Sequence, residues 1–144
     1  MNTLFVMVGI PGSGKSTYAN TLGFKVVSTD SIREELFGDA SDQRNGDVVF
    51  STAFERLNEE LKSGNSVVFD ATNVRRDARE RVLENCKNNY SKAVAVVMNT
   101  SLGNCITRND GRDRNVPVSV IRRMYHSFDP VTEDEKFDEV ITVD

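Results

Sequence analysis

The sequence contains no tryptophan, one histidine and two cysteines in 144 residues. Without tryptophan, and with tyrosine and phenylalanine scattered, it lacks the aromatic platform on which an extended single strand of nucleic acid stacks. Cys86 and Cys105 do not have CxxC spacing, so we interpret them as reduced, buried thiols. The only histidine, His126, is interpreted as structural, which leaves any general-base role to a carboxylate.

Long apolar runs and an excess of positive charge are also missing. No stretch resembles a signal peptide or is apolar enough to span a bilayer, so we expect a cytoplasmic protein without a membrane partner. The 18 Lys+Arg and 22 Asp+Glu give a formal net charge of −4, so any polyanionic partner must be met locally. The length suits a single domain over residues 1–144.

Short β-branched runs alternate with helical patterns along the whole chain. This alternation is typical of an α/β fold in which a parallel sheet lies between two layers of helices. The five expected strands are Thr3–Val8, Lys25–Thr29, Ser66–Phe69, Lys92–Met98 and Glu139–Val143. An irregular, arginine-rich stretch is expected over Arg108–Pro117, followed by a helix over Val118–Phe128 with Pro117 in its first turn.

The first expected strand leads directly into Gly9-Ile10-Pro11-Gly12-Ser13-Gly14-Lys15-Ser16, which completes the pattern GxxxxGK[ST] of a P-loop. Its glycines let backbone N–H groups turn toward phosphate oxygens, and the following helix points its positive end at the same place. We therefore predict a site for a nucleoside triphosphate with Mg²⁺, in which Lys15 reaches the β- and γ-phosphates and Ser16 binds the metal. The other residues predicted to hold the nucleotide here are Gly12, Ser13, Gly14 and Thr17.

The acceptor side of the site must be sought at the other strand ends. Asp30 follows the second expected strand, and Arg33 lies one turn later if a helix begins at Asp30. Beside a γ-phosphate, Asp30 is suited to accept the proton of an attacking hydroxyl, and Arg33 to hold an anionic group of the acceptor. The alternative is that Asp30 only caps the helix and Arg33 is a surface residue.

The third expected strand is followed by Asp70, as in a Walker B strand, so Asp70 is a second candidate ligand of Mg²⁺; the alternative is a capping role. Thr72-Asn73 are interpreted as helix-capping or phosphate-contacting groups. The run Arg75–Arg81 holds four arginines and two acids, which indicates a solvated helix face with ion pairs four residues apart.

Three arginines of the irregular stretch, Arg108, Arg112 and Arg114, form a possible lid over the phosphates. One of them in that position would stabilise charge on the transferring group. The alternative is a solvated loop. Arg108 and Arg112 are the candidates for binding the nucleotide.

Taken together, these motifs resemble the kinase domain of phage-type 5′-hydroxyl polynucleotide kinases. The resemblance covers nearly the whole chain and rests on the P-loop, Ser28–Arg33, Asp70–Asn73, and the residues Arg108, Arg112, Val116-Pro117, Ile121, Met124-Tyr125 and Ser127-Phe128. It implies ATP-dependent phosphorylation of a 5′-hydroxyl end, with Asp30 as general base, Arg33 on the acceptor and Arg112 on the donor phosphates. Members with a C-terminal phosphatase domain continue beyond the final strand, so removal of a 3′-phosphate is not expected.

Two other functions remain compatible with the sequence. Kinases of small molecules share the same outline, and an acidic, compact chain suits a nucleoside or another metabolite as acceptor. A nucleotide-dependent switch or ATPase that contacts a partner protein would also carry a P-loop. The sequence does not decide between DNA and RNA, and it leaves the oligomeric state open.

Overall fold

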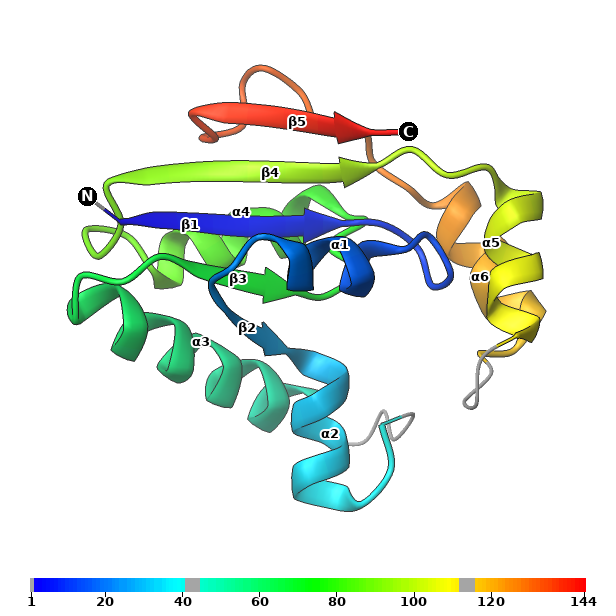
Figure 1. The fold of residues 1–144 in the computed structure, drawn as a ribbon, viewed down its shortest axis with the longest axis horizontal. Helices are drawn as coiled ribbons and strands as arrows, with labels where there is room; N and C mark the ends of the chain where they lie inside the picture. Colours follow the sequence, from blue (N-terminus) through cyan, green and yellow to red (C-terminus); the bar gives the residue numbers. More distant parts are fainter. Residues whose placement is uncertain (1, 41–44, 112–115) are drawn as a thin grey trace.

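The computed structural model describes residues 2–40, 45–111 and 116–144. At its centre is a sheet of five parallel strands in the order β2-β3-β1-β4-β5, which confirms the predicted α/β class (Figure 1). The strands are β1 (Thr3–Val8), β2 (Lys25–Ser28), β3 (Val67–Asp70), β4 (Lys92–Met98) and β5 (Glu139–Val143). The helices are α1 (Lys15–Thr21), α2 (Thr29–Phe37), α3 (Gly46–Lys62), α4 (Arg76–Asn85), α5 (Leu102–Asp110) and α6 (Val118–His126).

Helices cover both faces of the sheet, as the three-layer prediction requires. Leu4 and Val6 of β1 belong to an apolar cluster with residues of α3 and α4, whereas Met7 belongs to a cluster with Ala19 of α1. Side chains alternate between the two faces of a strand, so this division places α1 on one face and the pair α3 and α4 on the other.

The helices α5 and α6 stand beyond the carboxyl ends of the strands (Figure 1). A third apolar cluster joins them to the loops that follow β1 and β3, through Ile10, Val74, Cys105 and Ile121. Open α/β sheets bind ligands at this edge. The cluster therefore fixes the helix pair beside the region where a site is expected.

The start of α2 differs from the prediction. The helix begins at Thr29, because the Ser28 hydroxyl accepts a hydrogen bond from the Ser31 amide at 3.2 Å and caps the first turn. Asp30 therefore lies inside the first turn, and the interpretation of Asp30 as the helix cap was wrong. The strand β3 also ends one residue later than predicted, since Asp70 pairs with Ser28 in the sheet.

The arginine-rich stretch is more helical than predicted. Arg108 lies in the last turn of α5, so the prediction of an irregular segment from Arg108 onward was wrong at its start. Helix α6 ends at His126 rather than Phe128, and Pro117 is its cap rather than a first-turn residue. Arg112 and Arg114 lie outside the described residues.

The charged run Arg75–Arg81 is only partly the solvated face that was predicted. Arg76 and Glu80 form the expected exposed pair four residues apart, with N and O at 2.9 Å. Arg79, in contrast, is fully buried and pairs with Glu135. The prediction failed there because the partner of Arg79 lies far along the chain.

Both cysteines are buried and unpaired, as predicted. Burial raises the pKa of the Cys86 thiol to about 12, which keeps it protonated. Within the described ranges, no helix is both long and apolar enough to cross a membrane.

Candidate active site

The P-loop joins β1 to α1 in a backbone conformation that requires its glycines. Gly12 and Gly14 have φ angles of 83° and 90°, which L-residues with a side chain rarely adopt. Gly12 also packs directly against the main chain of α5, because a Cβ atom there would overlap the carbonyl oxygen of Cys105. The loop therefore depends on glycine both for its own shape and for the approach of α5.

A cavity of about 230 Å³ opens over this loop and is lined by Gly12, Gly14, Lys15, Ser16, Thr17 and Arg108. Tyr18 donates the first hydrogen bond of α1, to the carbonyl of Gly14 at 3.0 Å. The N–H groups of the first turn precede that bond and have no acceptor within the helix. All six lining residues are predicted or candidate nucleotide ligands: four lie in the P-loop, Thr17 follows it in α1, and Arg108 comes from α5.

Asp70 lies next to Ser16, the metal ligand predicted from the P-loop. The Ser16 hydroxyl donates a hydrogen bond to Asp70 Oδ2 at 2.7 Å, and Lys15 Nζ lies 3.7 Å from Asp70 Oδ1. Asp70 Oδ1 is buried and accepts no hydrogen bond from the described residues. A hydroxyl and a carboxylate oxygen of this kind are hard donors that suit Mg²⁺.

Magnesium would need further ligands at this position. The described residues contain no group of three or more His, Cys, Asp or Glu side chains able to hold a metal ion. Protein sites for Mg²⁺ commonly supply one or two side chains and leave the remaining positions to water and phosphate oxygens. Ser16 and Asp70 therefore fit a metal that is bound together with a nucleotide.

Replacing Asp70 by asparagine is expected to raise the Mg²⁺ concentration needed for half-maximal nucleotide binding by about tenfold, by analogy with losses at outer-shell metal partners. The amide keeps the size of the side chain and its bond to Ser16 but removes the charge that attracts the cation. Calorimetric titration of ADP at a series of Mg²⁺ concentrations measures the change. An unaltered Mg²⁺ dependence would rule Asp70 out as a metal partner.

Asp30 and Arg33 lie at the end of the neighbouring strand. Because Ser28 is paired with Asp70 across β2 and β3, the first turn of α2 begins beside Asp70 at the same sheet edge. Arg33 Nη1 donates to Asp30 Oδ1 at 3.3 Å. Arg33 is buried, contrary to the surface alternative, and its Nε finds no hydrogen-bond acceptor among the described residues.

Arg108 is the described arginine that lies against the P-loop. Its Nη1 donates to the carbonyl of Ser13 at 3.2 Å, and Thr100 Oγ1 donates to the same carbonyl at 2.8 Å. Arg108 therefore reaches the predicted phosphate site from α5. Arg112, the predicted lid residue, falls outside the described ranges, and His126 is exposed at the end of α6.

Several residues that shape the site were missed or misinterpreted at the sequence level. Asn73 has a left-handed backbone (φ 47°), and its side-chain amide donates to the carbonyl of Met7 at 2.8 Å. The carbonyl of Thr72 accepts from the Gly9 amide at 2.9 Å. Thr72 and Asn73 thus hold the start of the P-loop instead of capping α4, whose cap is Arg75. A non-glycine residue in this backbone conformation gives no reliable sequence signal except the modest preference of asparagine.

Comparison with known families gives a match between residues 4–131 and the AAA domain family AAA_33. The chain is 26% identical over 147 residues to L-seryl-tRNA(Sec) kinase of Methanococcus maripaludis, a match that covers 88% of this chain. It is 27% identical over 142 residues to a protein of Autographa californica nuclear polyhedrosis virus that is provisionally named a bifunctional polynucleotide kinase/RNA ligase, covering 87% of this chain. The chain spans 52% of the first relative and 20% of the second.

Two solved structures show the same fold. A chain of the Pnkp1/Rnl/Hen1 RNA repair complex superposes with a TM-score of 0.78 at 22% identity, covering 88% of this chain and 43% of that one. A gluconokinase from Sinorhizobium meliloti superposes with a TM-score of 0.65 at 20% identity, covering 99% of this chain and 82% of that one. At these identities the likeness concerns the fold.

Proposed function

We propose that this chain, which belongs to the AAA domain family AAA_33, is an ATP-dependent kinase that transfers the γ-phosphate of ATP to the 5′-hydroxyl end of a DNA or RNA strand. Members of this family have a P-loop kinase fold, so ATP is the expected donor. The acceptor is the part of the proposal that depends on this chain's own residues.

The observation that carries the proposal is the pairing of Asp30 with Arg33 at the strand end next to Asp70. A carboxylate at this edge is suited to take the proton of an attacking hydroxyl. The buried guanidinium beside it keeps an unused N–H donor, which suits an anionic group attached to that hydroxyl. The 5′-terminal nucleotide of a DNA or RNA strand offers both a 5′-hydroxyl and a phosphodiester.

The proposed transfer is a single in-line displacement. The 5′-oxygen forms a bond to the γ-phosphorus while the bond from that phosphorus to the β–γ bridging oxygen breaks, and the hydroxyl proton passes to Asp30. Lys15 and Arg108 bind phosphate oxygens, and Arg112 is proposed to join them. Mg²⁺, held through Ser16 and Asp70, would neutralise developing charge on the phosphates.

Charge and similarity both support a nucleic-acid acceptor. The chain is acidic overall, but α6 carries exposed Arg122 and Arg123 and no acidic residue. A local basic face of this kind suits contact with a few phosphates rather than a long strand. The similarity to a polynucleotide kinase/RNA ligase and to an RNA repair complex favours the same class of substrate.

Incubation with γ-labelled ATP, Mg²⁺ and 5′-hydroxyl oligonucleotides tests the proposal directly. We expect label in DNA or RNA oligonucleotides that end in a 5′-hydroxyl and none in the same oligonucleotides carrying a 5′-phosphate. The 5′-phosphorylated strands serve as the matched control because they bind without offering a nucleophile. Failure to label any 5′-hydroxyl strand would exclude the polynucleotide acceptor.

A kinase of a small hydroxyl compound is the second candidate. The fold shared with a gluconokinase and the acidic composition support it. ADP release measured over a panel of nucleosides and sugar acids separates the two candidates. A response confined to oligonucleotides would eliminate the small-molecule candidate.

Replacing Arg33 by methionine is expected to raise the KM for an oligonucleotide acceptor by about ten- to a hundredfold, the range of one lost charge-assisted hydrogen bond. The KM for ATP should stay unchanged, because Arg33 does not line the cavity over the P-loop. Arg56→Met is the matched control, since Arg56 lies on α3 and pairs with Glu35 instead. Equal acceptor KM values in the two variants would remove Arg33 from the acceptor site.

A further inference from the structure

Arg79 and Glu135 form a buried ion pair behind the candidate active site. Arg79 Nε and Nη2 donate to the two carboxylate oxygens of Glu135 at 2.7 and 3.0 Å. The side chains are 0% and 1% exposed. Burial raises the pKa of Glu135, but the hydrogen bonds from Arg79 and the Thr132 amide and the positive charges of Arg79 and Arg76 together outweigh it. The pKa therefore lies below its usual value and the carboxylate stays charged.

The remaining nitrogen of the Arg79 guanidinium points toward the nucleotide site. Its Nη1 donates to the carbonyl of Asn73 at 2.9 Å, inside the left-handed turn that follows β3. That turn is bonded to the end of β1, through Asn73 to Met7, and to the first residue of the P-loop, through Thr72 to Gly9. Hydrogen bonds and the main chain of residues 72–73 therefore connect Glu135, through Arg79, to Gly9 at the start of the P-loop.

The segment 129–135 is attached to the same turn at its other end. The amide of Asp129 donates to the carbonyl of Val74 at 2.7 Å, and Asp129 Oδ2 accepts from the Arg76 amide at 2.9 Å. Glu135 Oε2 also accepts from the amide of Thr132 at 2.9 Å, which closes the segment on itself. The segment is thus bonded to the turn after β3 at both of its ends, directly through Asp129 and indirectly through the pair of Glu135 with Arg79.

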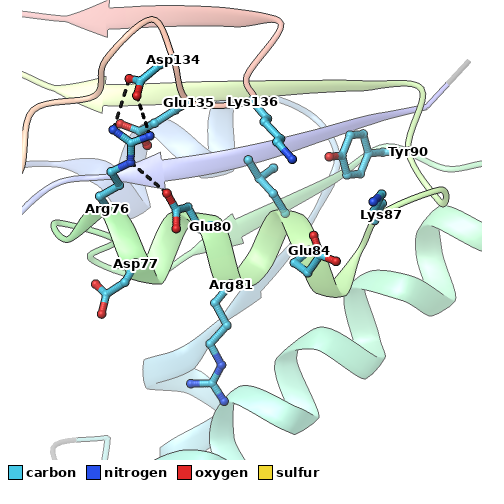
Figure 2. A pocket seen from close by; sticks show the side chains of 11 residues that line it. Arg76, Asp77, Glu80, Arg81, Glu84, Lys87, Tyr90, Asp134, Glu135 and Lys136 are labelled. Carbon is cyan, nitrogen blue, oxygen red and sulfur yellow. Dashed lines mark hydrogen bonds and ion pairs between the residues drawn. The ribbon is translucent and has the colours of Figure 1, made fainter.

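A second, exposed layer covers the buried pair. Arg76 contacts Glu80 and Asp134 at the surface, along one wall of a cavity of about 620 Å³ over α4 (Figure 2). Exposed pairs of this type contribute little to stability. The two layers therefore offer a comparison, because Asp134 and Glu135 are neighbours in one segment and differ in burial and in what their partners touch.

Stability alone does not require a charged pair at this place. Replacing a buried ion pair by apolar side chains of similar volume is often neutral or stabilising, because the desolvation of both charges is avoided. Apolar side chains would fill the space behind α4, but they would not hold the carbonyl of Asn73. The guanidinium of Arg79, in contrast, holds this carbonyl in a fixed position. It therefore fixes the turn that follows Asp70 and contacts the start of the P-loop.

We propose that Arg79 and Glu135 are positioning residues that fix the turn at Asn73 and thereby set Asp70 relative to the P-loop for nucleotide binding. The proposal rests on the nucleotide-binding half of the proposed function and is independent of the acceptor. Neither side chain lines the cavity over the P-loop, so both act through Asn73.

The test is the double variant R79M/E135L, with Asp134→Asn as the matched control in the same segment. We expect the double variant to unfold at a temperature close to that of the parent, while its affinity for Mg²⁺-ADP falls by about ten- to a hundredfold. Asp134→Asn should change neither property. A stable double variant with parental affinity for Mg²⁺-ADP would overturn the proposal.

A second measurement decides the matter if the double variant does not fold. Glu135→Gln keeps the size of the side chain and one hydrogen bond to Arg79, and its amide hydrogen exchange can be compared with the parent. Faster exchange confined to residues 6–12 and 71–76 supports positioning, whereas a uniform rise over the chain overturns it. None of these measurements uses an oligonucleotide, so inactivity toward oligonucleotides would contradict the acceptor proposal alone.

Discussion

Replacing Asp30 by asparagine is expected to lower the rate of phosphoryl transfer by about two to four orders of magnitude, the usual contribution of a general base. Asparagine keeps the shape of the side chain but cannot take up the proton of the attacking hydroxyl. The affinity for Mg²⁺-ADP should stay unchanged, because Asp30 lies in the first turn of α2 and does not line the cavity over the P-loop. Single-turnover transfer and ADP titration measure the two quantities separately.

Glu34→Gln is the matched control for this prediction. Glu34 is an exposed carboxylate one turn further along α2, so its replacement tests the loss of a negative charge without touching the strand end. If Asp30→Asn and Glu34→Gln both transferred phosphate at the parental rate, Asp30 would not be the general base. Unchanged ATP turnover in Asp30→Asn, together with no transfer to any hydroxyl, would instead favour the nucleotide-dependent switch or ATPase.

Replacing Gly12 by alanine is expected to destabilise the protein by about 2–5 kcal/mol and to abolish measurable nucleotide binding. The first cause is the φ angle of 83°, which a residue with a Cβ adopts only at a cost. The second is steric, because the new methyl group would overlap the carbonyl oxygen of Cys105 and lie 2.9 Å from its carbon. Helix α5 must then move away from the loop, and the contacts of Arg108 and Thr100 with Ser13 are lost.

Gly23→Ala separates the two causes. Gly23 has a φ angle of 82°, but a Cβ there would meet no atom within 4 Å. We expect it to cost only about 1–2 kcal/mol and to leave nucleotide binding intact. Urea unfolding and ADP titration of both variants give the comparison. If Gly12→Ala and Gly23→Ala lowered the affinity for ADP to a similar extent, the contact between the P-loop and α5 would have no effect on nucleotide binding.

The sequence predicts the parts of this molecule that depend on local pattern. Three strands have the predicted bounds, and the P-loop lies where its spacing places it, between the first strand and the first helix. Asp70 was predicted as a metal ligand from its place after an apolar run; it contacts Ser16 in the structure, and its binding of a metal stays a prediction. Such features follow from side-chain periodicity and from the backbone freedom of glycine, which are readable in a short window.

What the sequence does not predict depends on partners far apart in the chain. Arg79 looks solvated among its charged neighbours, and its burial is explained only by Glu135, 56 residues later. The close contact between Gly12 and Cys105 involves the main-chain carbonyl of Cys105, so the side chain at position 105 does not predict it. The helix cap is Ser28, two residues before Asp30, the cap considered from the sequence; serine and aspartate are both good caps, and local pattern does not choose between them.

The separate apolar cluster of α5 and α6 has a consequence for how the molecule opens. Its buried members include two residues outside the helix pair, Ile10 and Val74, so the pair shares little core with the sheet. We expect the two helices to detach as one cooperative unit, at a lower free energy than global unfolding. Since α5 carries Arg108 and presses on Gly12, each detachment would also dismantle the phosphate site. A bound nucleotide would therefore slow amide exchange in α5 and α6 more than in the central strands.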